Sequence, residues 1–244
     1  MNNLFRYLSV FLLISLLSCE EEDSLETDLQ GFVSFEAAPV LVDIPENTTK
    51  TIEVTVAASE SVNTDRTFNI VIDEEETTLT SDFNLPESVT IPANSKQTTI
   101  SVDLTDDESL SFTRQSLTFN FEDEPNTDFG EPVSIEAAQE CLENLVTFNL
   151  TLDNFPEETS WELFDLNDPN NPVLIDSAGP YQNPADIDAE LVNKFCLASG
   201  DYGLAIYDSY GDGGPTYSVS DSSGVLVEET TLEGDQATVT FTVD

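Results

Sequence analysis

The sequence has 244 residues and no histidine, and only 6 residues are Lys or Arg against 49 Asp or Glu. The absence of histidine excludes Ser-His-Asp and Cys-His catalytic units, histidine metal sites and histidine acid–base chemistry. The formal net charge of −43 (6 − 49) repels phosphate backbones, so we expect no nucleic-acid binding. Charge of this size keeps a protein soluble and is common in proteins that work in salty water, where salt screens the self-repulsion. We therefore attribute the acidity to the protein's environment before attributing it to a ligand.

Long hydrophobic runs are scarce, and the longest lies near the N-terminus. An apolar core at residues 8–17 is too short to span a bilayer, so it predicts a secretory signal peptide over residues 1–18. The core ends in Leu-Leu-Ser-Cys at residues 16–19, which resembles the lipobox of bacterial lipoproteins. That resemblance implies cleavage before Cys19 and lipidation of Cys19. An ordinary signal peptide that happens to precede a cysteine is the alternative.

An acidic run, Glu-Glu-Glu-Asp, follows directly at residues 20–23. Blocks of like charge repel and stay extended, so residues 19–30 are predicted to be the lipidated cysteine and a flexible acidic tether. The run also resembles the signal that sends lipoproteins of some Gram-negative bacteria to the outer face of the outer membrane; a plain solvated linker is the alternative. We therefore expect the membrane as a partner, through the N-terminal lipid, and a protein facing the cell exterior.

Residues 31–139 alternate between apolar and polar positions in short segments. Residues 51–56, 67–72, 99–104 and 116–121 each offer one apolar and one polar face, and turn-forming clusters separate them. No segment has a convincing helical period. The pattern predicts an all-β fold, with an antiparallel β-sandwich of immunoglobulin-like or jelly-roll-like type.

Several motifs of this region follow one another in a distinctive order. Ile-Pro-Glu-Asn at residues 44–47 precedes an alternating strand, and Thr-Ser-Asp-Phe at 80–83, Val-Thr-Ile-Pro-Ala-Asn at 89–94 and an acidic cluster at 106–108 come later. This order resembles the Calx-β domain over about residues 32–137. The resemblance implies an immunoglobulin-like sandwich, which in some members binds calcium through acidic loops at one end.

Carried over by position, the resemblance implies calcium ligands in three loops. Calcium takes hard oxygen ligands, and carboxylates gathered at one pole supply them. Where the family has further acidic residues this chain has Arg114, which would oppose a cation, so a calcium-free sandwich is the alternative. The predicted ligands are Glu46, one residue of the middle acidic loop (Glu74, Glu75 or Glu76, with Glu75 at its centre), Asp82, Asp106, Asp107 and Glu108.

Residues 140–244 are predicted to form a second β module, with one short helical turn at residues 188–193. Cys141 and Cys196 are the only cysteines besides Cys19, and an even pair in an exported protein predicts a disulfide. The expected strands are residues 145–152, 160–164, 202–207, 216–220 and 237–243.

The most specific motif of the chain is Asp-Ser-Tyr-Gly-Asp-Gly at residues 208–213. Together with the preceding cysteine, a Gly-Asp-Tyr and an early Trp-x-Leu strand, it resembles a β module of secreted bacterial and algal proteins. Asp208 and Asp212 flank a turn whose glycines permit positive φ, which brings two carboxylates toward one point. The turn therefore predicts a calcium site. A strand-to-strand turn whose aspartates accept backbone N–H bonds is the alternative.

These features predict a non-enzymatic, surface-anchored lipoprotein whose β-sandwich modules bind calcium and serve adhesion or ligand display. No motif singles out a catalytic pair of carboxylates, and a catalytic thiol is not expected without histidine. The alternative is a carbohydrate-binding accessory of a surface polysaccharide-uptake system. Its expected aromatic platforms are Tyr181 and Tyr210, because Trp161 and Tyr207 lie on strand patterns and are expected in the core. The further partner would be a surface glycan or an extracellular protein.

Overall fold

The computed structural model describes residues 31–36, 39–107, 109–168 and 170–244. The predicted signal peptide, Cys19, the acidic tether and Glu108 lie outside these residues. Across the described ranges the all-β prediction is confirmed, since the single helical element is the short 3-10 helix η1 (Pro156–Glu158). No helix in this part of the chain is long and apolar enough to cross a bilayer.

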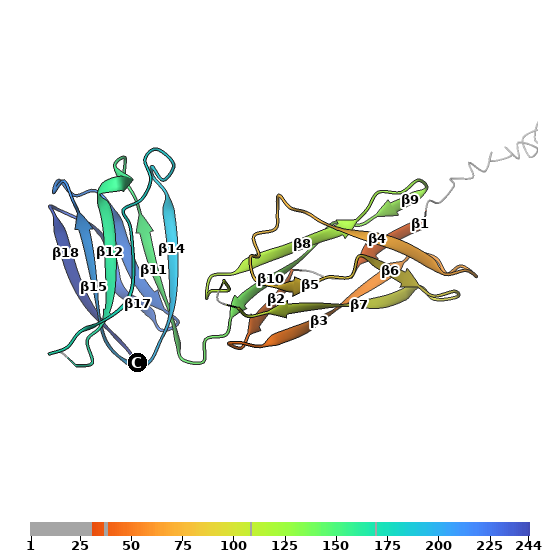
Figure 1. Ribbon diagram of the computed structural model, residues 1–244, viewed down its shortest axis with the longest axis horizontal. Helices are drawn as coiled ribbons and strands as arrows, with labels where there is room; N and C mark the ends of the chain where they lie inside the picture. The colour runs from red at the N-terminus through yellow and green to blue at the C-terminus, as the bar shows by residue number, and fades with distance from the viewer. Residues whose placement is uncertain (1–30, 37–38, 108, 169) are drawn as a thin grey trace, which may run out of the picture.

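Two β-sandwiches follow one another along the chain (Figure 1). The first consists of two five-stranded sheets, with the strand orders β5-β7-β3-β1-β9 and β2-β10-β8-β4-β6. Its strands are β1 (Gly31–Phe35), β2 (Val40–Ile44), β3 (Thr49–Ala58), β4 (Arg66–Ile72), β5 (Phe83–Asn84), β6 (Ser88–Ile91), β7 (Gln97–Thr105), β8 (Gln115–Phe121), β9 (Thr127–Phe129) and β10 (Val133–Gln139).

Most neighbouring strands of the first sandwich are antiparallel, as predicted, but two pairs are parallel. β1 pairs with β9 and β2 pairs with β10 in parallel register. The sequence pattern did not reveal these pairs, because alternation identifies strands without showing that β1 and β2 lie in opposite sheets.

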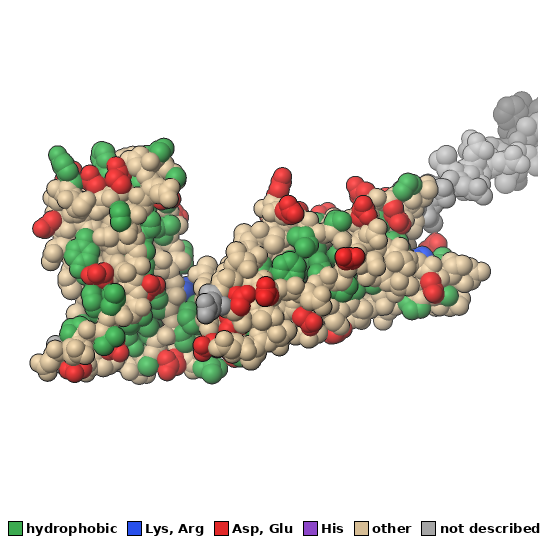
Figure 2. All heavy atoms as spheres, viewed as in Figure 1, with side chains coloured by type: hydrophobic (Ala, Val, Ile, Leu, Met, Phe, Trp, Pro, Cys, Tyr) green, Lys and Arg blue, Asp and Glu red, His purple; other side chains and the backbone are tan. Residues whose placement is uncertain are grey.

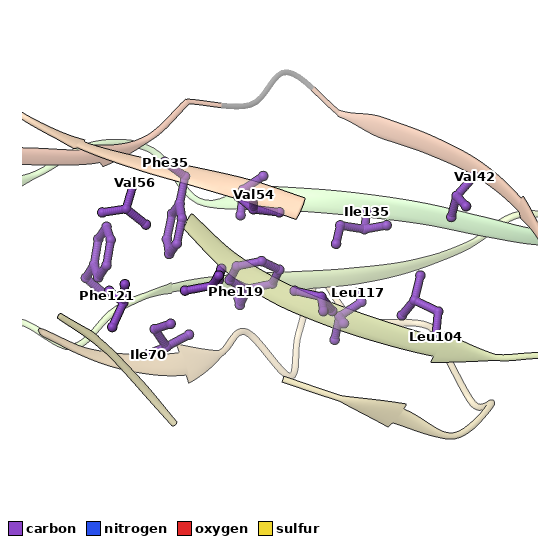
Figure 3. Close-up of a cluster of buried hydrophobic side chains, with 14 of the residues drawn as sticks. Phe35, Val42, Val54, Val56, Ile70, Leu104, Leu117, Phe119, Phe121 and Ile135 are labelled. Atoms are coloured by element: carbon purple, nitrogen blue, oxygen red, sulfur yellow. The ribbon is translucent and has the colours of Figure 1, made fainter. Parts of the chain in front are cut away.

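The inward-facing positions of these strands fill the space between the two sheets (Figure 3). Val54 and Val56 of β3 are 1% and 0% exposed, since alternate residues of a strand point to the same face. Phe35 of β1 stacks on Phe121 of β8 with 4.2 Å between ring centroids, and meets Phe119 edge-on at 5.1 Å. Because β1 and β8 belong to different sheets, these aromatic contacts hold the sheets together.

The second sandwich consists of two four-stranded sheets, with the orders β14-β11-β16-β17 and β13-β12-β15-β18. Trp161 forms the centre of its core, 2% exposed and edge-on to Phe148 and Phe195. The strands are β11 (Asn144–Thr151), β12 (Thr159–Asp165), β13 (Val173–Ala178), β14 (Glu190–Leu197), β15 (Gly200–Asp208), β16 (Thr216–Asp221), β17 (Gly224–Thr231) and β18 (Gln236–Val243).

The helical turn predicted at residues 188–193 is wrong. Turn structure ends at Asp188, and residues from Glu190 onward belong to β14, which pairs with β11 along its whole length from Glu190 to Leu197. Pairing with β11 gives this segment its extended conformation, and the local sequence pattern is too weak to predict a strand there.

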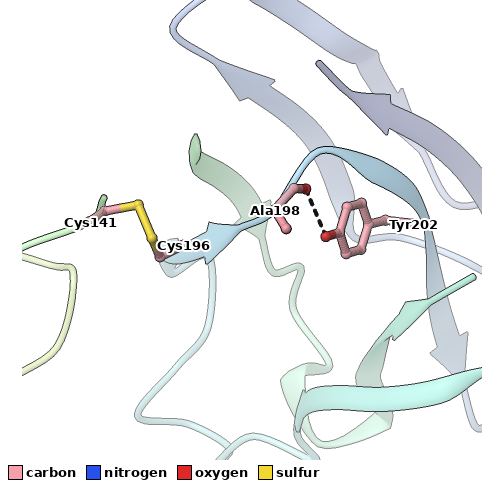
Figure 4. Close-up of a disulfide and its surroundings, with 4 residues drawn as sticks. All are labelled: Cys141, Cys196, Ala198 and Tyr202. Atoms are coloured by element: carbon pink, nitrogen blue, oxygen red, sulfur yellow. Dashed lines mark hydrogen bonds between the residues drawn. A yellow bond between two sulfur atoms is a disulfide. The ribbon is translucent and has the colours of Figure 1, made fainter. Parts of the chain in front are cut away.

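The predicted disulfide between Cys141 and Cys196 is confirmed. It joins the chain just before β11 to β14, and Figure 4 shows it beside the β14–β15 connection. In that connection the Tyr202 hydroxyl donates a hydrogen bond of 2.8 Å to the carbonyl of Ala198. Disulfides of this kind are typical of proteins outside the cytoplasm.

Candidate functional site

Three of the predicted calcium ligands meet at one end of the first sandwich, Asp82, Asp106 and Asp107. Pairing of β5 with β7 brings them together, and the Asp82 N–H donates 2.9 Å to Asp107 Oδ2. The Asn47 N–H, one residue after the predicted ligand Glu46, donates 2.7 Å to Asp106 Oδ2. However, no three carboxylates of the described part of this sandwich have ligand oxygens within 4.8 Å of one another.

Asp106 and Asp107 are adjacent in the chain but differ in how their oxygens are used. Asp107 accepts from the Ser109 hydroxyl at 2.6 Å and from the Ser109 N–H at 2.8 Å, and these bonds together with the Asp82 N–H lower the pKa of Asp107. Asp106 is 5% exposed, and its buried Oδ1 has no hydrogen-bond partner among the described residues. Asp107 therefore closes its loop, whereas Asp106 keeps unused acceptor capacity.

The predicted ligand Glu75 lies elsewhere in the first sandwich. Glu75 lines a groove together with Phe121, the last residue of β8. The first residue of β8, Gln115, lies at the loop of Asp107, because its side chain donates a hydrogen bond of 3.1 Å to the Ser109 carbonyl. The two ends of this strand are about 20 Å apart at 3.3 Å per residue. The structure does not bring Glu75 together with the three aspartates.

Positive charge is scarce on the surface, and Arg114 is already paired. On the face shown in Figure 2, acidic side chains are spread over both sandwiches and Lys and Arg side chains are few. The Arg114 guanidinium contacts Asp43 Oδ1 at 2.7 Å and donates to the carbonyls of Val42 and Glu136. Arg114 therefore ties β2 and β10 together, and Asp43 balances its charge.

In the second sandwich the Asp-Ser-Tyr-Gly-Asp-Gly motif forms a turn that folds back over Asp208. Asp208 Oδ1 accepts the N–H groups of Tyr210 and Gly211 at 2.8 and 3.0 Å, and Oδ2 accepts the N–H of Gly213 at 2.6 Å. Gly213 has φ +81°, and a Cβ at that position would lie 2.3 Å from the Leu232 carbonyl oxygen, so the turn requires glycine there.

Hydrogen bonding outweighs burial at Asp208. Its side chain is 4% exposed, and burial by itself would raise the pKa of the carboxyl group. The N–H bonds from Gly211, Tyr210 and Gly213 more than offset burial, so the pKa of Asp208 is lowered. The carboxylate is thus held ionised in an almost fully buried position.

A third carboxylate, which the sequence did not indicate, joins this turn. Pairing of β12 with β15 places Thr159 opposite Asp208, and the Ser209 N–H donates 2.9 Å to the carbonyl of Glu158. One carboxylate oxygen each of Glu158, Asp208 and Asp212 lies within 4.8 Å of the others. We call these three residues the acidic cluster.

The acidic cluster carries uncompensated negative charge. Burial and the charges of Asp208 and Asp212 raise the pKa of Glu158, because each neighbouring carboxylate disfavours its ionised form. No Lys or Arg pairs with the cluster in the ranges covered by the structure. Only strand pairing brings Glu158 to this place, since it lies far from the motif in the sequence.

The two aromatic residues expected to bind glycans have different surroundings. The Tyr181 hydroxyl accepts a hydrogen bond of 2.8 Å from Trp161 Nε1, and the side chain of Tyr181 packs against the core of the second sandwich. Tyr210 is 76% exposed at the tip of the Asp208 turn. Tyr181 thus supports the core, and Tyr210 has one of the most exposed aromatic rings.

No protein-family model and no curated protein matches the sequence. Among solved structures, the chain is similar to the apo form of the Calx CBD1 domain, at 10% identity over 45% of this chain and 97% of that chain, with a TM-score of 0.37. It is also similar to a multidomain protein including DUF1735 from Bacteroides ovatus, at 11% identity over 86% and 95% of the two chains, with a TM-score of 0.39. A Bacteroides ovatus protein of unknown function matches at 10% identity over 81% and 72%, with a TM-score of 0.43.

Proposed function

We propose that this protein is a surface-anchored, non-enzymatic lipoprotein whose second sandwich binds calcium through the acidic cluster. The observation that carries the proposal is the convergence of Glu158, Asp208 and Asp212, whose ligand oxygens lie within 4.8 Å of one another. Calcium would offset two of the three negative charges of the cluster and make the turn a rigid surface for adhesion or ligand display.

The donor set of the cluster fits calcium. All three ligands are carboxylates, the hard oxygen donors that calcium takes in flexible geometry. Asp208 is held in place by three N–H groups, and its Oδ2, which accepts only one of them, the Gly213 N–H, retains a further lone pair for a cation. Like charges at this separation repel, so a divalent cation placed between them stabilises the folded turn.

In the first sandwich, Asp106 offers a buried carboxylate oxygen that could bind calcium. Its Oδ1 is buried without a partner, and a buried polar atom of this kind costs stability until something pairs with it. Asp82 lies at the same end of the sandwich. This second site is subordinate in the proposal, because the described carboxylates there do not form a three-residue cluster.

Anchoring and orientation support the display role. The predicted lipid and acidic tether precede Gly31, and in Figure 1 β1 begins at the end of the first sandwich that lies away from the second. A chain anchored there would hold the second sandwich away from the membrane. The disulfide is consistent with such a position outside the cytoplasm.

Thermal unfolding of the full-length protein tests the proposal, with calcium, with magnesium or with chelator at constant high ionic strength. Trp161 is the single tryptophan and lies in the core of the second sandwich, so its fluorescence reports that module. We expect calcium to raise the unfolding midpoint and magnesium to leave it unchanged. Equal midpoints in all three conditions would refute calcium binding.

Glu158→Gln provides a test with the opposite sign. The raised pKa of Glu158 means that its ionised form is disfavoured in the folded protein, so removing the charge should raise the midpoint in chelator at neutral pH. That gain should vanish at a pH below the ordinary glutamate pKa, where Glu158 is protonated in both states. The same substitution should abolish the calcium response.

The matched control is Glu157→Gln. Glu157 belongs to the same 3-10 helix, but its carboxylate accepts hydrogen bonds from the Asn183 side chain at 2.9 and 3.1 Å. Glu157→Gln should therefore keep the calcium response. An equal loss of response in both variants would assign the effect to the general negative charge and not to the cluster.

A further inference from the structure

The outer face of the sheet β13-β12-β15-β18 carries a group of polar and aromatic side chains on three adjacent strands. Trp161, Leu163 and Ile206 point inward and are buried, so the residues between them point outward. In the strand register Ser160 lies opposite Tyr207, and Glu162 lies opposite Ser177. Ser160, Glu162, Ser177 and Tyr207 therefore share the outer face.

The side chains of Tyr207 and Glu162 are linked across this face. Glu162 lies opposite Ala205, two residues from Tyr207, and yet the Tyr207 hydroxyl donates 2.8 Å to Glu162 Oε2. The tyrosine side chain must therefore reach diagonally from β15 to β12 and lie along the sheet. Ala205 points outward but is only 6% exposed, as expected beneath such a ring.

These residues line an open groove of about 490 Å³ together with Gly179 and Pro180. The volume falls within the range of small-molecule sites, about 300–1,000 Å³. Ser160 and Ser177 form no side-chain hydrogen bond with other described residues, and Glu162 uses only Oε2. The groove thus offers an aromatic ring, two unpaired hydroxyl groups and a free carboxylate oxygen, all on strands whose positions are fixed by pairing.

We propose that this groove binds a neutral saccharide. A sugar ring has an apolar C–H face that packs on an aromatic ring and hydroxyl groups that pair with serine hydroxyls and a carboxylate. Glu162 and the net charge of −43 repel anionic ligands, which excludes phosphorylated, sulfated and uronic sugars. None of the groove side chains belongs to the acidic cluster, so the inference is independent of calcium binding. It also differs from the sequence-based expectation, which favoured Tyr181 and Tyr210.

Affinity electrophoresis of the full-length protein tests this inference, in native gels containing neutral polysaccharides: laminarin, a mannan, a xylan or a xyloglucan. Alginate and carrageenan serve as anionic controls, and a chitosan gel tests cation binding. We expect retardation by at least one neutral polymer and by neither anionic one. Failure of all neutral polymers, or retardation by chitosan alone, would overturn the inference.

Two substitutions assign the binding to the groove. Tyr207→Ala removes the ring and should weaken binding by up to about tenfold, the equivalent of one aromatic stacking contact. Ser177→Trp fills the groove from the exposed edge strand β13 without touching the core, so it should abolish binding even if Tyr207→Ala fails to fold. Tyr210→Ala is the matched control, since it removes an exposed tyrosine of the same sandwich and should bind like the wild type. Wild-type binding by Ser177→Trp would place the saccharide elsewhere.

Discussion

Each sandwich has a buried aspartate where a long strand ends, and the two carboxylates are satisfied differently. Asp106 follows β7 and is 5% exposed, and Asp208 ends β15 and is 4% exposed. Asp208 accepts three backbone N–H groups, whereas Asp106 accepts one from the part of the chain that the structure describes, where its Oδ1 has no partner. Equal burial therefore does not imply equal hydrogen bonding.

Glycine accounts for much of the difference. Gly211 and Gly213 have φ of +90° and +81°, which lets the turn curl back and direct its N–H groups at Asp208. The loop after β7 contains no glycine, and there the neighbouring Asp107 accepts the N–H of Ser109 in the loop and the N–H of Asp82. In the second sandwich the N–H groups of the turn itself satisfy the buried carboxylate of Asp208. In the first sandwich the loop does not satisfy the buried carboxylate of Asp106 in the same way.

The two sandwiches also differ in their aromatic residues, which makes them separately measurable. Residues 31–139 contain phenylalanine but no tyrosine or tryptophan, whereas Trp161, Tyr202 and Tyr217 are buried in the second sandwich. Tryptophan fluorescence therefore follows the second sandwich, and near-ultraviolet circular dichroism in the phenylalanine region is weighted toward the first.

Removing the disulfide should have the largest effect. Replacing Cys141 and Cys196 together by serine opens a covalent loop spanning a sequence separation of 55 residues. In the chain-entropy treatment such a loop contributes about 4 kcal/mol to the free energy of unfolding. Urea unfolding followed by Trp161 fluorescence should show this loss, with the phenylalanine signal unchanged. An equal loss in both signals would mean that the sandwiches unfold as one unit.

Asp208→Ala should have the next largest effect. It leaves three N–H groups without their acceptor. Two of these hydrogen bonds are only partly buried, so each lost acceptor costs about 1 kcal/mol, the lower end of the usual range, and the second sandwich loses roughly 3 kcal/mol. Chelator must be present in this urea titration, so that calcium plays no part. Asp212→Ala is the control, because it removes a repelling charge of the same cluster but no acceptor of these N–H groups, so it should not destabilise the second sandwich. Similar losses in the two variants would contradict the role assigned to the N–H bonds.

The stabilisation by Asp208 should depend on pH with a definite sign. Its pKa is lowered in the folded protein, so the contribution is complete above the ordinary aspartate pKa and is lost as the pH falls through the folded value. The difference in unfolding free energy between wild type and Asp208→Ala should shrink in that acidic range. A difference that stayed constant would mean that the ionised form is not what the turn stabilises.

The sequence predicted the strands well where apolar and polar residues alternate. β3, β7 and β8 each have one buried face, so their pattern is strong. β13 and β17 lie at sheet edges with few buried positions, and β14 depends on pairing with β11, so local pattern indicates none of the three. The parallel pairs likewise depend on which sheet a strand enters, and alternation carries no such information.

The candidate site was predictable only where its residues are neighbours in the sequence. Asp208 and Asp212 lie within one motif, and the positive φ of its glycines follows from their chemistry. Glu158 reaches them through the pairing of β12 with β15, which no local pattern reveals. The same pairing turns Tyr207, expected in the core from its strand pattern, toward the outer groove.

Asp106→Ala should have the smallest effect, although Asp106 is as buried as Asp208. The substitution leaves one N–H, that of Asn47, without an acceptor, and it also removes an oxygen that has no partner. The cost to the first sandwich in chelator should be about 1 kcal/mol or less, because loss of the hydrogen bond is partly offset by loss of an unsatisfied polar atom. Asp107→Ala should destabilise more, despite its greater exposure, because Asp107 accepts from Asp82 and twice from Ser109. A larger loss of unfolding free energy for Asp106→Ala than for Asp107→Ala, measured by the phenylalanine signal, would contradict this. It would show that burial, and not the number of hydrogen bonds accepted, determines how much each aspartate stabilises the first sandwich.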